Sequence, residues 1–302
     1  WWTATARFAD IVLPATTTLE RNDIGASSSD RFIIAMKKVV EPFAEARHDH
    51  DILAGLAERL GILDSFTERR DERAWLESIY QVTRANAAEA GLEMPAFSDF
   101  WDAGFVEFPE PAAPFQSFAA FREDPVANPL ATPSGRIELF SERIASFGYD
   151  DCPGHPTWLE PREWLGAEKA ELYPLHLISN QPRTRLHGQL DYVGASRASK
   201  IQGREPIRMH PLDAAARQLR EGDIVRVSND RGACLAGLTL SDALRPGVVQ
   251  LATGAWYDPL DPKTPGSLDV HGNPNVLTHD LGTSKLSGGP AAHSVLVQIE
   301  RF

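Results

Sequence analysis

The feature that most constrains the fold is a series of short apolar segments between Tyr173 and the carboxyl terminus, separated by turns. One helix is predicted among them, over residues 212–219, and Glu221-Gly222-Asp223 follows it as a stop signal. Many short strands at close spacing, with one helix between them, are typical of a closed β-barrel. We therefore expect a barrel whose strands cover residues 175–178, 223–227, 233–240, 247–251 and 295–299.

The amino-terminal half shows a different pattern, in which helices dominate. Apolar residues recur at helical spacing over residues 49–60, and Gly61 follows as a C-terminal cap. A second helix is predicted from near Asp71 to just before Gly91. This half is therefore expected to fold separately from the barrel.

Two further strands and a short helix are predicted in the same half. Residues 9–14 form a short apolar run closed by a proline, which favours an interior strand. Because the chain begins at Trp1 without a methionine or a polar lead-in, we expect an excised segment whose first strand pairs with neighbours outside it. Ile137 and Leu139 alternate with polar residues as in a strand, and residues 141–147 predict a helix.

Two segments rich in proline and aromatic residues lie between these elements. Residues 94–133 are expected to form an ordered but irregular surface excursion, because disordered segments are poor in aromatic residues. Residues 152–165 hold three prolines and two tryptophans and form the candidate connection between two domains.

The composition limits the functional classes. Of 302 residues, 42% are hydrophobic and 24% charged, which suits a soluble protein of two domains. The net charge of −12 repels nucleic acids and anionic membranes, and no apolar run approaches the ~20 residues needed to cross a bilayer. Cys152 and Cys234 are expected to be ordinary buried thiols. The Walker phosphate loop, the GxSxG hydrolase motif and the GxGxxG fingerprint do not occur.

The densest polar cluster follows the strand predicted at 175–178. Its guanidinium, amide, hydroxyl and imidazole groups suit recognition of phosphates and of the edge of a heterocycle. On composition alone a solvated basic loop explains the segment equally well. The candidate residues are Ser179, Asn180, Gln181, Arg185, Leu186, His187 and Gln189.

A second polar cluster lies near the carboxyl end. Residues 271–278, which include Asn275, precede the glycine-rich residues 282–289, which include Ser284. Glycine lets a backbone approach a polar ligand closely, so these residues are candidates for ligand binding. Glycine-rich turns in barrels are also commonly no more than turns, and that alternative stays open.

The sequence His48-Asp49-His50-Asp51 superficially resembles a metal site. Alternating ligands before a helix are expected to point in divergent directions, and a metal pair on a helix needs i, i+4 spacing. We therefore predict that an aspartate caps the helix, that both histidines are exposed, and that no residue of the chain binds a metal.

Several segments together resemble the molybdopterin oxidoreductases, specifically the dimethyl sulfoxide, trimethylamine N-oxide and biotin sulfoxide reductases. The resemblance covers essentially the whole chain, in the family's order, and is somewhat stronger to biotin sulfoxide reductase than to the periplasmic N-oxide reductases. The matching segments are 9–23, 132–138, 155–158, 180–189 and 273–278.

The resemblance implies a fold of two parts. Residues 1–150 are expected to be the closing section of an α/β molybdopterin oxidoreductase domain, an incomplete three-layer structure. Residues 151–170 then form a linker, and residues 171–302 a double-psi β-barrel that binds the molybdopterin dinucleotide. In this family two molybdopterin guanine dinucleotides hold one molybdenum, and we expect this bis(molybdopterin guanine dinucleotide)molybdenum in the parent enzyme but not in the isolated fragment.

The resemblance also gives the two polar clusters a common purpose. Arg185, His187 and Gln189 would contact the cofactor from one side and Asn275 from the other. The family carries the serine that binds the metal in a region preceding this chain, so the fragment alone is expected to be inactive. A glutamine is expected where Gly288 stands, and glycine has no side-chain amide to offer the pterin. Either a water or a neighbouring residue takes its place, or this loop binds more weakly.

The function implied for the parent protein is reduction of small S-oxides or N-oxides by oxygen-atom transfer. The expected partners are the amino-terminal remainder of the same polypeptide and the oxide substrate, without nucleic acid or membrane insertion. A bacterial, cytoplasmic rather than periplasmic location is expected. The alternative is a non-catalytic barrel that serves as an interaction module, which predicts no concave pocket between the 179–189 loop and Asn275.

Overall fold

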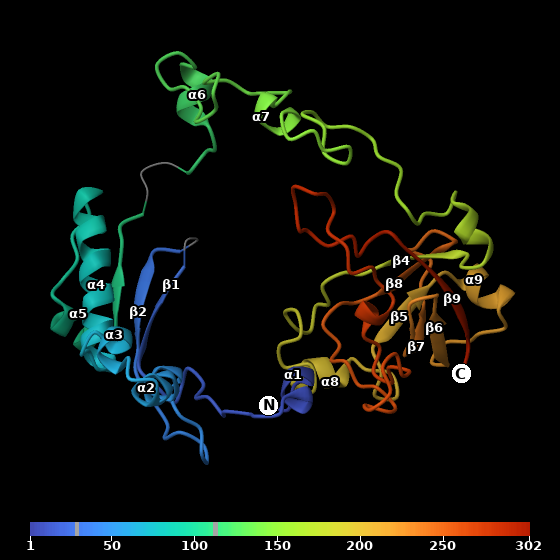
Figure 1. Cartoon of the computed structure of the whole chain (residues 1–302), viewed down its shortest axis with the longest axis horizontal. Helices are drawn as coiled ribbons and strands as arrows, with labels where there is room; N and C mark the ends of the chain where they lie inside the picture. The colour runs from blue at the N-terminus through green and yellow to red at the C-terminus, as the bar shows by residue number, and fades with distance from the viewer. Residues whose placement is uncertain (28–29, 111–113) are drawn as a thin grey trace. The chain divides into compact units, whose positions relative to one another are not determined.

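The buried apolar side chains form two separate cores, one around Leu177 and Val225 and the other around Tyr80 and Phe100. The computed structural model describes residues 1–27, 30–110 and 114–302. Two compact units result (Figure 1): Trp1–Phe8 with Asp124–Phe302, here called the barrel unit, and Ala9–Glu123, here called the sheet unit.

The barrel unit contains a closed barrel of six strands in the order β4-β8-β5-β7-β6-β9. Two pairs, β4 with β8 and β5 with β7, run parallel, and the other four pairs run antiparallel. The inward side chains, such as Leu177, Val225 and Leu238, are fully buried and form one apolar core. The strands are β4 (Leu175–Ile178), β5 (Pro206–Met209), β6 (Ile224–Ser228), β7 (Ala233–Leu240), β8 (Val248–Leu251) and β9 (Val295–Arg301).

Short helices precede the barrel strands or connect them along the sequence. Helix α9 begins at a proline, which suits the first helical position, and His210 caps it by accepting a hydrogen bond from the Leu212 N–H. The helices of the barrel unit are α1 (Ala4–Phe8), α7 (Glu142–Ala145), α8 (Gly194–Ala198) and α9 (Pro211–Ala216), with 3-10 turns η1 (Glu168–Glu171) and η2 (Pro274–Val276).

The sheet unit packs helices against one face of a three-stranded antiparallel sheet in the order β1-β2-β3 (Figure 1). Its core is aromatic: Tyr80 stacks on Phe100 with ring centroids 4.5 Å apart, and Ile33 contributes from the sheet. The elements are β1 (Asp23–Ala26), β2 (Phe32–Met36), α2 (Asp49–Arg59), α3 (Leu63–Thr67), α4 (Glu72–Glu89), α5 (Phe97–Ala103), β3 (Phe105–Glu107) and α6 (Ala119–Glu123).

Most elements predicted from the sequence are confirmed. Helix α2 ends before Gly61, and α4 begins after its cap Asp71 and ends before Gly91, with both glycines at positive φ. The five predicted strands of the barrel and the helix at 141–147 are also found, and the closed barrel itself is confirmed. Strand β5 was not predicted.

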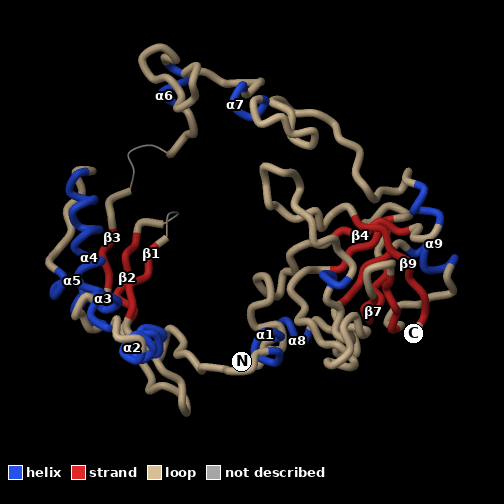
Figure 2. Tube along the Cα trace, viewed as in Figure 1, coloured by secondary structure: helices blue, strands red, loops and turns tan. Residues whose placement is uncertain are grey.

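Two predicted strands are wrong. Residues 9–14 are exposed and drawn as loop (Figure 2), and in the described chain only the bridge between Ala15 and Arg47 lies next to them. Ile137 and Leu139 are likewise exposed and irregular. A strand needs backbone partners along its length, whereas the hydrogen bond from the Arg47 N–H to the Pro14 carbonyl, over 3.1 Å, reaches only the end of residues 9–14.

The expected irregular excursion at 94–133 is also corrected in part. It contains α5, β3 and α6. Helix α5 forms because Phe97 and Phe100 recur at helical spacing and pack on Tyr80, and β3 forms by pairing with β2. Pro111, which contributed to the proline-rich pattern, lies outside the described residues.

The expectation for His48-Asp49-His50-Asp51 is wrong in two respects. The N-cap of α2 is His48, no side chain caps the helix, and both histidines are half-buried rather than exposed. Of the two free cysteines, Cys234 is fully buried and Cys152 half-buried. Among the described residues, no helix has both the length and the apolar composition that spanning a membrane requires.

Candidate functional site

Two polar segments far apart in the sequence meet around one cavity of about 370 Å³ in the barrel unit. Strands β4 and β8 run parallel, so the residues that follow each of them lie at the same end of the barrel. The Thr253 N–H accordingly donates to the Asn180 carbonyl over 2.9 Å. The cavity is lined by Ser179, Asn180, Gln181, Thr253, Asn275, Thr278, Pro290, Ala292 and His293.

Among the described residues, the lining of this cavity offers hydroxyl, amide and imidazole groups and no carboxylate, although the chain as a whole carries a net charge of −12. The Ser179 hydroxyl oxygen is buried without a hydrogen-bond partner among the described residues. A buried, unpaired hydroxyl is costly, and a polar ligand would relieve that cost. The donor set therefore suits an anionic or polar ligand such as a phosphate.

His293 is a lining residue that the sequence analysis did not select. Its Nδ1 accepts from the Ser179 N–H over 3.4 Å, and its carbonyl oxygen lies 2.8 Å from Nε2 of His176. Thr253 was also missed, since only the pairing of strands distant in sequence brings it here, whereas Thr278 belongs to the segment 271–278 that was selected as a candidate.

His187 shapes the loop without lining the cavity. Its backbone N–H donates to Oε1 of Gln181 over 3.1 Å, and its Nδ1 lies 2.8 Å from Nε2 of the same amide. His187 also has a φ of 49°, in the left-handed region. The loop thus uses the Gln181 side chain to hold its own turn.

The other predicted residues lie off the cavity lining. Leu186 and Gln189 are exposed. The Ser284 hydroxyl accepts hydrogen bonds from the Leu286 and Ser287 N–H groups within its own turn. A Cβ added at Gly288 would meet open space, so this turn has room for the glutamine expected there.

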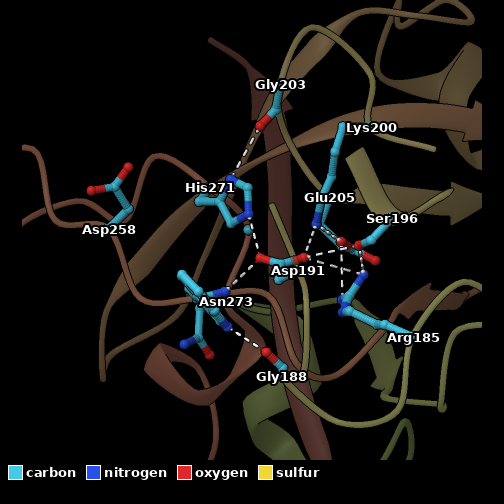
Figure 3. Close-up of polar contacts among 12 residues, drawn as sticks. Arg185, Gly188, Asp191, Ser196, Lys200, Gly203, Glu205, Asp258, His271 and Asn273 are labelled. Carbon is cyan, nitrogen blue, oxygen red and sulfur yellow. Dashed lines mark hydrogen bonds and ion pairs between the residues drawn. The ribbon is translucent and has the colours of Figure 1, made fainter. Parts of the chain in front are cut away.

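Arg185 is buried in the barrel unit rather than exposed at the cavity. Its side chain is 1% exposed and donates to the Thr253 carbonyl over 2.7 Å and to the Ser196 hydroxyl over 3.2 Å. It also pairs with Asp191 and Glu205 (Figure 3). The guanidinium therefore ties the 179–189 loop to the turn after β8.

Asp191 is the centre of this buried network (Figure 3). Its carboxylate accepts from Nζ of Lys200 over 2.6 Å and from the Trp256 N–H over 3.0 Å, and lies 2.7 Å from Nε2 of His271. Burial raises the pKa of Asp191, but these hydrogen bonds outweigh it and lower the pKa well below its ordinary value. Lys200 bridges the same carboxylate to Glu205.

Asp269 performs a similar role beside Asn275. Its carboxylate accepts the backbone N–H groups of His271, Gly272 and Asn273, and burial nevertheless raises its pKa. Asn273 in turn accepts from the Asn275 N–H over 2.8 Å. Asp191 thus holds one side of the cavity through Arg185, and Asp269 holds the other side through Asn273. The type of residue alone did not predict these roles, because they depend on burial.

The cavity bears on the alternative of a non-catalytic interaction module. That alternative required no concave pocket between the 179–189 loop and Asn275, whereas residues of both segments line this one.

Comparison with known proteins gives matches to two family models. Residues 175–296 match the Molydopterin dinucleotide binding domain, and residues 1–59 match the Molybdopterin oxidoreductase model. Acetylene hydratase from Pelobacter acetylenicus is similar in structure, with a TM-score of 0.71 and 22% identity over 100% of this chain and 39% of that chain. At that identity the likeness shows the fold alone.

Curated relatives match over essentially the whole chain. Dimethyl sulfoxide/trimethylamine N-oxide reductase of Cereibacter sphaeroides is 52% identical, over 100% of the chain and 37% of the relative. Trimethylamine-N-oxide reductase 1 of Escherichia coli (strain K12) is 49% identical, over 100% of the chain and 36% of the relative. Biotin sulfoxide reductase of Cereibacter sphaeroides is 46% identical, over 99% of the chain and 40% of the relative, so identity does not support the expected preference for that enzyme.

The chain therefore spans between about a third and two fifths of the length of these relatives. On the matches of both its segments, it belongs to the molybdopterin oxidoreductases, in the group of dimethyl sulfoxide, trimethylamine N-oxide and biotin sulfoxide reductases.

Proposed function

We propose that the complete protein reduces small S-oxides or N-oxides and that this chain helps to hold its cofactor, bis(molybdopterin guanine dinucleotide)molybdenum. The observation that carries the proposal is the carboxylate-free cavity at one end of the barrel, between the loop after β4 and Asn275. It lies within residues 175–296, which match the dinucleotide-binding model. The named activities of the relatives support the reaction class.

The cavity residues fit a phosphate-bearing heterocycle. The side-chain amides of Asn180 and Asn275 offer donors and acceptors, and the unpaired Ser179 hydroxyl offers another donor, whereas the Gln181 amide is engaged by His187. Each hydrogen bond to a charged phosphate contributes about 1.5–3 kcal/mol. When bound, the cofactor supplies the oxygen-atom transfer chemistry, and these residues bind and orient it.

The remaining predicted residues have different proposed roles. Arg185 and His187 position the loop through Thr253 and Gln181. Leu186, Gln189 and Ser284 are proposed to touch the larger cofactor outside the cavity. The metal ligand and the remaining walls of the active site belong to other parts of the complete polypeptide, which is the principal partner of this chain.

We also propose a more specific fold for each part of the chain. We assign the barrel, residues 171–302, to the double-psi type, and its two parallel strand pairs among antiparallel ones support this. Residues 1–150 are proposed to belong to an incomplete three-layer α/β domain, joined to the barrel by residues 151–170. The layer of helices on the sheet of the sheet unit supports this assignment.

The reaction is tested on the complete natural polypeptide purified anaerobically. Reduced methyl viologen is mixed with dimethyl sulfoxide, trimethylamine N-oxide or biotin sulfoxide, and its oxidation is followed by absorbance. We expect oxide-dependent oxidation that is lost in protein from molybdate-starved cells. Equal rates in both preparations, or none with any oxide, would contradict the proposed function.

A further inference from the structure

Three side chains that can bind metals gather at the beginning of α2 in the sheet unit. His48, His50 and Asp51 each offer one ligand atom, and these atoms all lie within 4.8 Å of one another. The His50 ring and the Asp51 carboxylate are also neighbours, with Nδ1 of His50 3.7 Å from Oδ1 of Asp51. The cluster lies wholly in the sheet unit, whereas the proposed cofactor cavity lies in the barrel unit.

The backbone explains why the three side chains converge although their spacing did not predict it. His48 is the N-cap, with extended φ and ψ of −62° and 138°, whereas His50 and Asp51 lie in the first helical turn. Strand-like divergence applies only where the backbone stays extended, and the chain changes conformation between residues 48 and 49. The His50 ring is further held by stacking on Phe66, with centroids 5.7 Å apart.

Two imidazole nitrogens of this cluster have no partner. Nδ1 of His48 and Nε2 of His50 are buried and make no hydrogen bond among the described residues. Buried polar nitrogens are nearly always paired, and leaving them unpaired costs free energy. A cation bound by imidazole lone pairs would remove that cost.

We propose that His48, His50 and Asp51 bind one divalent transition-metal ion, with water completing the coordination. Two imidazoles and one carboxylate suit zinc, cobalt, nickel or copper, whereas magnesium and calcium prefer oxygen ligands throughout. Metal–ligand bonds of about 2.0–2.2 Å place ligands ~3.4 Å apart, so small side-chain rotations close the site. Asp49, also in the first turn, adds negative charge that opposes the positive end of the helix dipole.

The proposal is tested by titrating the complete, chelator-treated protein with Co²⁺ and recording the visible absorption of the bound ion. We expect one site whose absorption is lost on adding Zn²⁺ and unaffected by Mg²⁺. The double variant His48→Ala/His50→Ala and the variant Asp51→Asn should each weaken this binding at least about tenfold. The exposed His155 provides the matched control variant, His155→Ala, which should bind as the parent does.

X-ray absorption of the zinc-loaded parent protein gives a readout that does not depend on any variant folding. Scattering from two imidazoles around the zinc supports the proposal. Absence of imidazole scattering, absence of saturable Co²⁺ binding, or unchanged binding in the folded double variant overturns it. Because the site is in the sheet unit, none of these outcomes depends on molybdenum content or oxide reduction.

Discussion

At the scale of single residues, the barrel unit depends on buried carboxylates that are fully paired. Glu163 is 2% exposed and accepts from Nζ of Lys169 over 2.6 Å and from Arg231 over 2.7 and 3.0 Å. It also accepts the Leu296 N–H of β9 over 2.8 Å. Residues 151–170, which were expected to be only a linker, are thus anchored to the barrel by the Glu163 side chain.

Glu163 makes the stability of the chain depend on pH. Burial alone raises its pKa, but hydrogen bonds from Arg231 and Lys169 outweigh burial and lower the pKa from 4.5 to about 2. A lowered folded-state pKa adds stability that is complete above pH 4.5 and is lost as the pH falls toward about 2. For Glu163→Gln we expect a loss of ~3 kcal/mol at neutral pH and a flatter pH dependence, measured by calorimetry.

The matched control is Glu171→Gln, the same substitution at an exposed glutamate of η1. It should leave both the stability and its pH dependence nearly unchanged. If Glu163→Gln unfolds with the same pH dependence as the parent protein, the proposed anchoring by this carboxylate is wrong.

At the scale of elements, the turn after β8 and the loop after β4 are docked closely at Gly254. This glycine has a φ of 88°, and a Cβ there would collide with the His187 carbonyl oxygen. Gly254→Ala should therefore destabilise the chain by more than the ~1–2 kcal/mol of left-handed strain alone. Urea unfolding measures the difference.

The variant Gly266→Ala separates backbone strain from the steric collision. Gly266 has a φ of 76°, but a Cβ there would meet open space, so only backbone strain applies. Equal destabilisation by the two variants would show that the loop and the turn are not in close contact.

The elements with strong local patterns could be predicted from the sequence. The continuous apolar run of β7 and the capped helix α4 were placed nearly to the residue. Strand β5 was missed because it has four residues, begins with Pro206 and contains an arginine, although it pairs on both sides with β7 and β8. Its position depends on long-range pairing, which periodicity does not contain.

The same limit applied to the site. The loop after β4 and Asn275 could be selected because amides and glycines cluster in the sequence. The burial of Arg185 and the lining role of His293 could not, because both depend on which strands pair. The convergence of His48 with His50 was missed because a one-residue change of backbone conformation has no signature in residue spacing.

At the scale of the whole molecule, the two candidate sites lie in different units of the chain. The barrel unit holds the cavity and the whole segment that matches a dinucleotide-binding domain, and the sheet unit holds the candidate metal cluster. Because the chain spans about 37% of the length of a relative such as the Cereibacter sphaeroides reductase, the complete polypeptide is the object to measure.

The most direct test of the central claim is the molybdenum content per polypeptide of the complete protein carrying Asn180→Ala and Asn275→Ala. Both amides line the cavity, and loss of two hydrogen bonds to a charged cofactor should cost about 3–6 kcal/mol of binding. Asn86→Ala, at an exposed position of α4, is the control and should retain the parent's content. We predict molybdenum well below the parent level in the folded double variant, whereas a content equal to that of the parent would contradict the account.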